Sequence, residues 1–113
     1  MRDIVLSTVT EAYLECAAWA EGFAGEDFTD DAYGQAADDC LDFIEYAKDT
    51  YGENVFDGWD DAQIGHDFWL TRNGHGAGFW DRGFARGDDL TEAAKTFGPV
   101  DVVMDDDGML YFL

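Results

Sequence analysis

Basic residues are scarce in this sequence. Only 6 of the 113 residues are Lys or Arg, whereas 26 are Asp or Glu, which gives a formal net charge of −20. Nucleic acid is itself a polyanion, so this charge argues against direct nucleic-acid binding. A charge of this size also keeps molecules of the protein apart, and it makes a basic surface the expected kind of partner.

Long apolar runs and cysteine pairs are also missing. No run of 18 apolar residues occurs, so we expect no membrane-spanning helix. Residues 1–15 lack an apolar core long enough for a secretion signal, which indicates a cytoplasmic protein. The two cysteines, Cys16 and Cys40, form neither a metal-ligand spacing nor a CxxC pair. Both lie among apolar positions, so we predict reduced thiols in the core.

The composition is that of a folded chain. Apolar residues make up 47% and aromatic residues 16%, enough to offset the entropy of ordering the backbone. The length suits a single domain over residues 1–113. Within it we distinguish an acidic helical half, residues 1–61, from a second half, residues 62–113.

Two amphipathic helices are predicted in the first half. Thr8 and the Glu three residues later form a capping box, which predicts the start of the first helix. Thr29, followed by two Asp, predicts the start of the second, and Gly52 its end. Their apolar stripes are Val9, Tyr13, Cys16, Ala17, Ala20 and Phe23, then Tyr33, Ala36, Cys40, Ile44, Ala47 and Tyr51. The short loop between the helices predicts an antiparallel pair.

A β-hairpin is predicted over residues 66–83. Asn73-Gly74 is a strong signal for a type I′ turn, because both central positions of that turn need positive φ. This register places Phe68 opposite Phe79.

The rest of the second half completes an α+β prediction. Residues 59–64 and 89–97 read as short helices, and residues 100–104 and 109–113 read as strands of a second hairpin. The acidic loop of residues 105–108 lacks the length and closing Glu of an EF-hand, so we predict a turn. The expected fold is α+β, an N-terminal antiparallel helical hairpin packed with a small antiparallel sheet made of two hairpins and a short helix.

The block GHDFWLTRNGHGAGFWDRG, residues 65–83, resembles a block in a family of small, mostly uncharacterised phage and prophage proteins. The later LTEAAK segment and the ending D-G-x-x-Y are similar too, so the resemblance covers roughly the C-terminal half. The family carries no settled activity or catalytic residues. The resemblance therefore implies a phage context and supplies no chemistry.

Five residues on the predicted hairpin raise an enzymatic alternative: His66, Arg72, His75, Asp81 and Arg82. Two imidazoles and two guanidinium groups could form a nuclease or phosphotransfer site. Ion pairing within a small sheet is the simpler interpretation. The sequence has no Ser-His-Asp pattern and no phosphate-binding glycine loop before a helix. We predict no catalytic residue, metal or cofactor, and keep a small enzyme using His66, His75 and Asp81 as an alternative.

Carboxylates gather on one face of the second predicted helix. Their spacings of 7, 4, 3 and 4 residues place them in a row, which we call the acidic stripe: Asp31, Asp38, Asp42, Glu45 and Asp49. At a rise of about 1.5 Å per residue the stripe spans about 27 Å. Residues 1–61 hold 17 acidic and 2 basic residues, a net −15, whereas residues 62–113 hold 9 and 4, a net −5.

A row of like charges on a rigid helix can present a field similar to that of a nucleic-acid backbone. Together with the phage resemblance, the stripe predicts a phage-encoded acidic inhibitor of the anti-CRISPR or anti-restriction type. It would mimic nucleic acid and block the DNA- or RNA-binding surface of a host defence protein, in the host cytoplasm. The predicted partner-binding residues are Asp31, Asp38, Asp39, Asp42, Glu45, Asp49, Asp60 and Asp61.

The acidic stripe also fits two simpler interpretations. It could be an ordinary solvated face, and two lysines in 113 residues fit adaptation to high salt as well. A third possibility is a protein-binding module that does not mimic nucleic acid and uses the aromatic side chains of the predicted hairpin: Phe68, Trp69, Phe79 and Trp80. The sequence leaves the target and the oligomeric state open, with a homodimer among the options.

Overall fold

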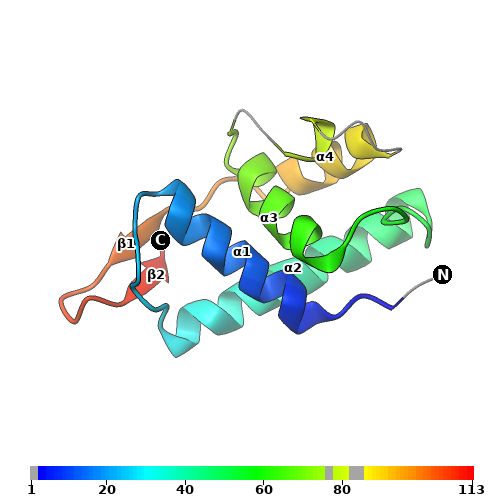
Figure 1. Ribbon diagram of the computed structural model, residues 1–113. Coiled ribbons are helices and arrows are strands. Elements are labelled where there is room, and N and C mark those ends of the chain that lie inside the picture. The colour runs from blue at the N-terminus through cyan, green and yellow to red at the C-terminus, as the bar shows by residue number, and fades with distance from the viewer. Residues whose placement is uncertain (1–2, 76–77, 82–85) are drawn as a thin grey trace.

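The computed structural model describes residues 3–75, 78–81 and 86–113, and Figure 1 shows their arrangement. Over these residues the chain forms α1 (Leu6–Ala20), α2 (Asp30–Tyr51), α3 (Asp61–Arg72), the 3-10 helix η1 (Phe79–Asp81), α4 (Gly87–Lys95), β1 (Val102–Met104) and β2 (Leu110–Phe112). The fold is therefore α+β, as predicted, with the described residues contributing one small two-stranded antiparallel sheet instead of two hairpins.

Helices α1 and α3 form the most extensive contact between two elements and lie side by side (Figure 1). Gly65 makes this approach possible, because a Cβ at that position would overlap the carbonyl oxygen of Val9. Helix α2 also contacts α1, but less extensively. The predicted pair of the first two helices is thus not the main packing unit.

The boundaries of α2 follow the sequence signals. The Thr29 hydroxyl accepts a 3.1 Å hydrogen bond from the backbone N–H of Ala32, as expected of an N-cap. Gly52 ends the helix with φ of 108°, a conformation that glycine adopts without steric penalty. Both predicted ends of this helix are confirmed.

The start of α1 was predicted wrongly. The helix begins at Leu6, with Val5 as its N-cap, so Thr8 lies inside the first turn instead of at the cap. The Val5 N–H donates a 3.0 Å hydrogen bond to the Asp61 carboxylate, and Leu6 packs against the core. The hydrogen bond to Asp61, which is 56 residues away in the sequence, therefore favours a helix that starts before the local capping signal.

The predicted hairpin over residues 66–83 is also wrong, because residues up to Arg72 belong to helix α3. Asp60 caps this helix by accepting a 2.8 Å hydrogen bond from the Gln63 N–H. The helix is buried on most of its circumference, which removes the one-sided apolar pattern that would reveal a helix. The part of the prediction that falls on residues 76–77 and 82–83 lies outside the described residues.

The Asn73-Gly74 pair ends α3 instead of turning a hairpin. The Gly74 N–H donates to the Thr71 carbonyl at 3.2 Å, and the His75 N–H donates to the Leu70 carbonyl at 3.0 Å. These two bonds, with Gly74 at φ of 72°, constitute a Schellman motif. A type I′ turn and a Schellman motif both need a residue with positive φ, so the same dipeptide fits both.

The second hairpin and the helix before it are present as predicted, but α4 begins and ends two residues earlier than predicted and both strands are shorter. Strand β1 pairs antiparallel with β2, with Val103 opposite Tyr111. In the acidic loop, the Asp105 side chain accepts 2.9 Å hydrogen bonds from the N–H groups of Asp107 and Met109. Two further hydrogen bonds join β2 to the α1–α2 connection, from Leu110 N–H to the Asp27 carbonyl and from Thr29 N–H to the Leu110 carbonyl.

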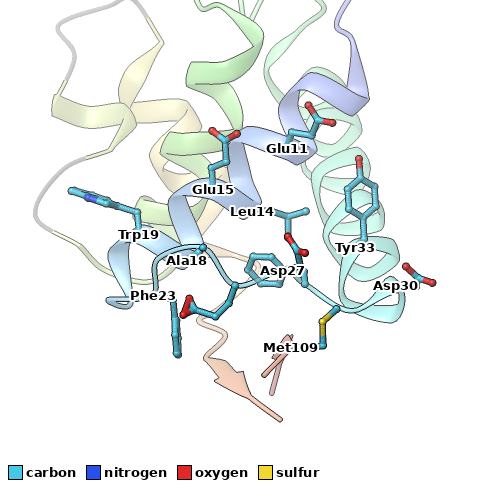
Figure 2. A pocket seen from close by; sticks show the side chains of 13 residues that line it. Glu11, Leu14, Glu15, Ala18, Trp19, Phe23, Asp27, Asp30, Tyr33 and Met109 are labelled. Carbon is cyan, nitrogen blue, oxygen red and sulfur yellow. The ribbon is translucent and has the colours of Figure 1, made fainter. Parts of the chain in front are cut away.

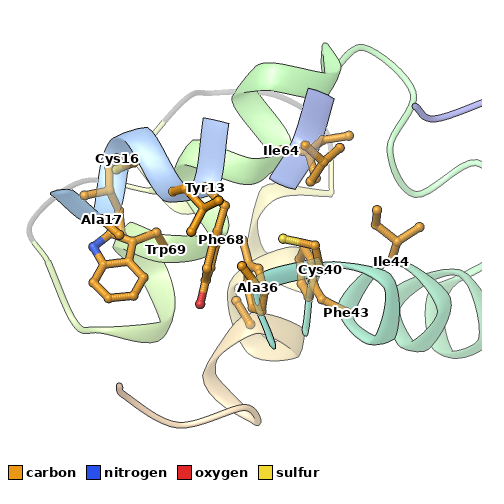
Figure 3. Packing of buried hydrophobic residues seen from close by; sticks show 14 of the residues in the cluster. Tyr13, Cys16, Ala17, Ala36, Cys40, Phe43, Ile44, Ile64, Phe68 and Trp69 are labelled. Atoms are coloured by element: carbon orange, nitrogen blue, oxygen red, sulfur yellow. The ribbon is translucent and has the colours of Figure 1, made fainter. Parts of the chain in front are cut away.

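The core lies between α1, α2 and α3 and is rich in aromatic rings (Figure 3). Phe43 of α2 stacks on Phe68 of α3 with ring centroids 4.2 Å apart. Cys16 and Cys40 are buried and form no disulfide, in agreement with the predicted reduced thiols. In the part of the chain that the structure describes, no helix has the length and apolar character needed to cross a membrane.

Candidate functional site

The acidic stripe projects from α2 on the side away from the core. Its five carboxylates are all exposed: Asp31, Asp38, Asp42, Glu45 and Asp49. At about 100° per residue, these positions fall within about 60° of one another around the helix axis. The buried positions of α2 occupy the other side: Ala32, Ala36, Cys40, Phe43, Ile44 and Ala47. The stripe is therefore one continuous outer face of an unbroken helix.

The other three predicted binding residues have roles within the fold. Asp39 is 27% exposed and pairs with Arg72, the two side chains being joined by a 2.9 Å contact. Asp60 caps α3, and Asp61 accepts the hydrogen bond from Val5. Because these carboxylates already bind groups of the same chain, they are weaker candidates for contacts with a partner than the stripe.

Arg72 is a structural residue that the sequence-based interpretation misplaced. Its guanidinium donates to the Asp39 carboxylate, to the Tyr13 hydroxyl at 3.0 Å, and to the backbone carbonyls of Phe97 and Gly98. The same group lies over the ring of Phe68, 5.3 Å from its centroid. A pattern on one hairpin could not reveal this role, since the acceptors come from α1, α2 and the segment after α4.

Two groups around this cluster have displaced pKa values. Burial raises the pKa of the Cys40 thiol to about 12, and the negative charge of Asp39 adds to the effect. Burial likewise raises the pKa of the Tyr13 hydroxyl well above its ordinary value, despite the nearby Arg72 guanidinium. Both groups therefore stay protonated at neutral pH and act as packing and hydrogen-bonding groups.

A pocket of about 850 Å³ lies at the start of α2, the end at which the stripe begins, between α1 and the α1–α2 connection (Figure 2). Five carboxylates line it: Glu11, Glu15, Glu26, Asp27 and Asp30. Four aromatic side chains line it as well: Trp19, Phe23, Phe28 and Tyr33. Tyr33 was predicted in the apolar stripe of the helix, yet it is 41% exposed because its position turns toward this pocket.

The residues of the enzymatic alternative do not share a hairpin. His66 lies on the surface of α3, with its Nδ1 atom 3.6 Å from a carboxylate oxygen of Asp67. His75 lies in the turn after α3, and Arg72 is buried. The Asp81 side chain and Arg82 lie outside the described residues. Among the residues that the structure describes, no group of three or more His, Cys, Asp or Glu could hold a metal ion.

The aromatic surface considered as an alternative binding site is mostly core. Phe68, Trp69 and Phe79 are completely buried, because α3 and η1 direct them inward. Trp80 is the exposed member of the four, at 49%. The interpretation of these four residues as a binding surface is therefore wrong for three of them.

The chain matches no model of a known protein family, and comparisons with curated proteins and with solved structures found no match. The candidate function therefore depends on the geometry and charge of the acidic stripe and of the pocket at the start of α2.

Proposed function

We propose that the protein is an acidic inhibitor that mimics a nucleic-acid backbone and occupies the nucleic-acid-binding surface of a host defence protein, of the anti-restriction or anti-CRISPR type. The observation that carries this proposal is the acidic stripe, five exposed carboxylates on one face of the 22-residue helix α2. Inhibition would be competitive, by occupancy and without turnover.

The spacing of the stripe supports mimicry. Successive carboxylates are separated along the helix by about 4.5 to 10 Å. Phosphates on one DNA strand are spaced by about 3.4 Å of axial rise, so the gaps in the stripe correspond to about one to three phosphate steps. Lys and Arg side chains that normally hold phosphates can pair with carboxylates at the same spacing.

The rigidity of α2 supports it as well. Phe43, Cys40 and Ala47 anchor the inner face of the helix and have no exposed area. Thr29 and Gly52 fix its ends, and the Asp39–Arg72 pair ties its middle to α3. A charge row held in place before binding loses little conformational entropy when a partner arrives.

Repulsion between the carboxylates of the stripe destabilises helix α2. Each pair of like charges three or four residues apart on a helix destabilises it by about 0.2–0.5 kcal/mol. Asp38, Asp42, Glu45 and Asp49 form three such neighbouring pairs. A binding role accounts for this arrangement, whereas other distributions of the same charges would serve equally well on a solvated face.

The test is a capture experiment with host lysate on the immobilised protein, at low and at high salt. We expect a nucleic-acid-binding protein to be captured, to be displaced by duplex DNA, and to be released as salt rises. The stripe variant Asp38→Asn, Asp42→Asn, Glu45→Gln should reduce capture by on the order of tenfold or more.

The matched control removes three exposed carboxylates from the β1–β2 side of the molecule: Asp101→Asn, Asp106→Asn, Asp107→Asn. It reduces the negative charge by the same amount and should leave capture unchanged. Equal losses in the two variants would show that total charge matters and not the stripe, which would refute mimicry. If neither variant changes capture and stability rises steeply with salt, salt adaptation is the better interpretation.

A further inference from the structure

The pocket at the start of α2 is acidic on several sides. Glu11 and Glu15 project from α1, Asp30 projects from the first turn of α2, and Glu26 and Asp27 lie in the connection between the helices (Figure 2). The Glu26 carboxylate accepts a 2.8 Å hydrogen bond from the Ala24 N–H, which shapes this connection. The side chains of the remaining four make no hydrogen bond or ion pair with another residue that the structure describes.

Aromatic and aliphatic side chains complete the pocket. Trp19 is 71% exposed and stands at one end, and Tyr33 stands at the other (Figure 2). Leu14 and Phe28 add apolar surface to the lining. Trp19 is the most exposed of the four tryptophans, and the faces of such rings attract cations.

No cation of the described chain occupies the pocket. None of its lining residues is basic. The arginines Arg72 and Arg86 pair with Asp39 and Asp89, which lie outside it. Charge complementarity therefore calls for a positively charged occupant, and the volume of about 850 Å³ suits a short segment better than a single ion.

We propose that this pocket binds a short protein segment that carries arginine beside an apolar residue. The guanidinium groups pair with Glu11, Glu15 and Asp30 and stack on the exposed rings, while the apolar side chain lies on Leu14 and Phe28. Arginine suits this site better than lysine, because its planar group both stacks on aromatic faces and pairs with carboxylates through two hydrogen bonds. A second copy of the chain is a poor occupant, since each copy carries a net charge of −20.

This inference rests on the proposed function and adds a second contact to it. Both surfaces include the start of α2, where Asp30 lines the pocket and the next residue, Asp31, begins the stripe about 100° further around the helix. One basic partner can therefore reach both surfaces. The stripe supplies attraction that salt screens, and the pocket supplies an apolar contact that salt does not weaken.

The test uses a synthetic peptide of sequence Arg-Leu-Arg-Leu-Arg with blocked ends, followed by amide chemical-shift mapping of the protein. We expect shifts at the Trp19 indole and at amides of residues 11–33, and binding that persists at high salt. The matched peptide Arg-Gly-Arg-Gly-Arg and the polyamine spermine carry charge without apolar side chains. Both should bind about tenfold or more weakly at high salt.

Two variants make the test specific. Trp19→Ala should weaken binding of the Arg-Leu peptide by about tenfold, whereas Trp80→Ala removes an exposed indole outside the pocket and should have no effect. Equal effects of the two variants, equal binding of spermine, or shifts confined to residues 38–49 would overturn the inference. Concentration-dependent shifts at α1 without any peptide would identify a second copy as the occupant and would also overturn it.

The outcomes separate this inference from the function on which it rests. If the Arg-Leu peptide fails to bind but capture of a host protein still depends on the acidic stripe, only the pocket inference fails. If the peptide binds in the pocket while the stripe variant captures as well as the original chain, mimicry fails and the pocket remains a binding site.

Discussion

The Arg72 guanidinium lies 2.9 Å from the Asp39 carboxylate, and this pair joins the end of α3 to the middle of α2. Arg72 is almost completely buried, whereas Asp39 keeps part of its surface in solvent. The pair therefore fixes the inner side of the helix that carries the acidic stripe. The scarcity of basic residues makes this one arginine important to the positioning of the proposed site.

Replacing Arg72 with Met should destabilise the protein by about 2–4 kcal/mol. Met fills similar space, but it leaves the Tyr13 hydroxyl and the carbonyls of Phe97 and Gly98 without their donor. The control Arg86→Met removes a surface pair with Asp89 and should change stability by less than about 1 kcal/mol. Urea unfolding of both variants measures the difference, and equal midpoints would contradict the structural role of Arg72.

The tight contact of α1 with α3 predicts a contrast between two glycines. Gly65→Ala should destabilise the fold by about 2–4 kcal/mol, because the new methyl group meets the Val9 backbone and the helices must separate. Gly34→Ala, on the exposed side of α2 with nothing within 4 Å, should stabilise it by about 0.5–1 kcal/mol. Thermal or urea unfolding tests both, and a neutral Gly65 variant would show that α1 and α3 are free to move apart.

The buried thiol predicts a loss of stability in alkaline solution. Folding raises the pKa of Cys40 from an ordinary value of 9.0 to about 12, so above about pH 9 the unfolded state releases a proton that the folded state retains. Stability should therefore be full below about pH 9 and fall as the pH rises toward 12, by up to about 1.4 kcal/mol per pH unit. Tyr13 adds to this fall at higher pH, because its pKa is raised in the same direction.

The measurement is urea unfolding under reducing conditions at a series of alkaline pH values. In Cys40→Ala the free energy of unfolding should fall less steeply with pH, by the contribution of about one proton, whatever the absolute stability of the variant. Cys16→Ala is not a suitable control, since that thiol is also buried. An unchanged slope in the Cys40 variant would mean that the alkaline loss arises elsewhere.

Neutralising the acidic stripe should stabilise the protein while it removes binding. The variant Asp38→Asn, Asp42→Asn, Glu45→Gln eliminates three neighbouring repulsions on α2 and should gain about 1 kcal/mol at low salt. The gain should shrink as salt screens the charges. Urea unfolding at two salt concentrations measures it, with the hairpin variant Asp101→Asn, Asp106→Asn, Asp107→Asn for comparison. A stripe variant that is less stable at low salt would show that the carboxylates support the fold.

The sequence predicted α2 well because its signals are local. A capping Thr29, a closing Gly52 and a one-sided apolar stripe are all readable without tertiary information, and so is the acidic stripe on the opposite face. Helix α3 has no such one-sided pattern, since neighbouring elements cover it on most sides. Because the helical period of α3 could not be recognised, the Asn73-Gly74 pair was the strongest remaining signal. This pair fits a helix end as well as a hairpin.

The pocket could not be predicted from the sequence for a different reason. Its walls come from α1, the α1–α2 connection, the start of α2 and Met109 at the edge of the sheet. Tyr33 was predicted in an apolar stripe and Trp19 in none, and only the packing of the helices shows that both stay in solvent. The acidity of the region was evident, but the aromatic surface beside it was not.

Leu110 couples two parts of the molecule that look separate in the sequence. Its N–H and carbonyl bind Asp27 and Thr29, so the connection that borders the pocket is paired with the last strand almost as an additional strand. The connection can open only if its two hydrogen bonds to Leu110, at the edge of the sheet, break. Amide hydrogen exchange at Leu110 should consequently slow when the pocket is filled, which makes a backbone group remote from α1 a reporter of its occupancy.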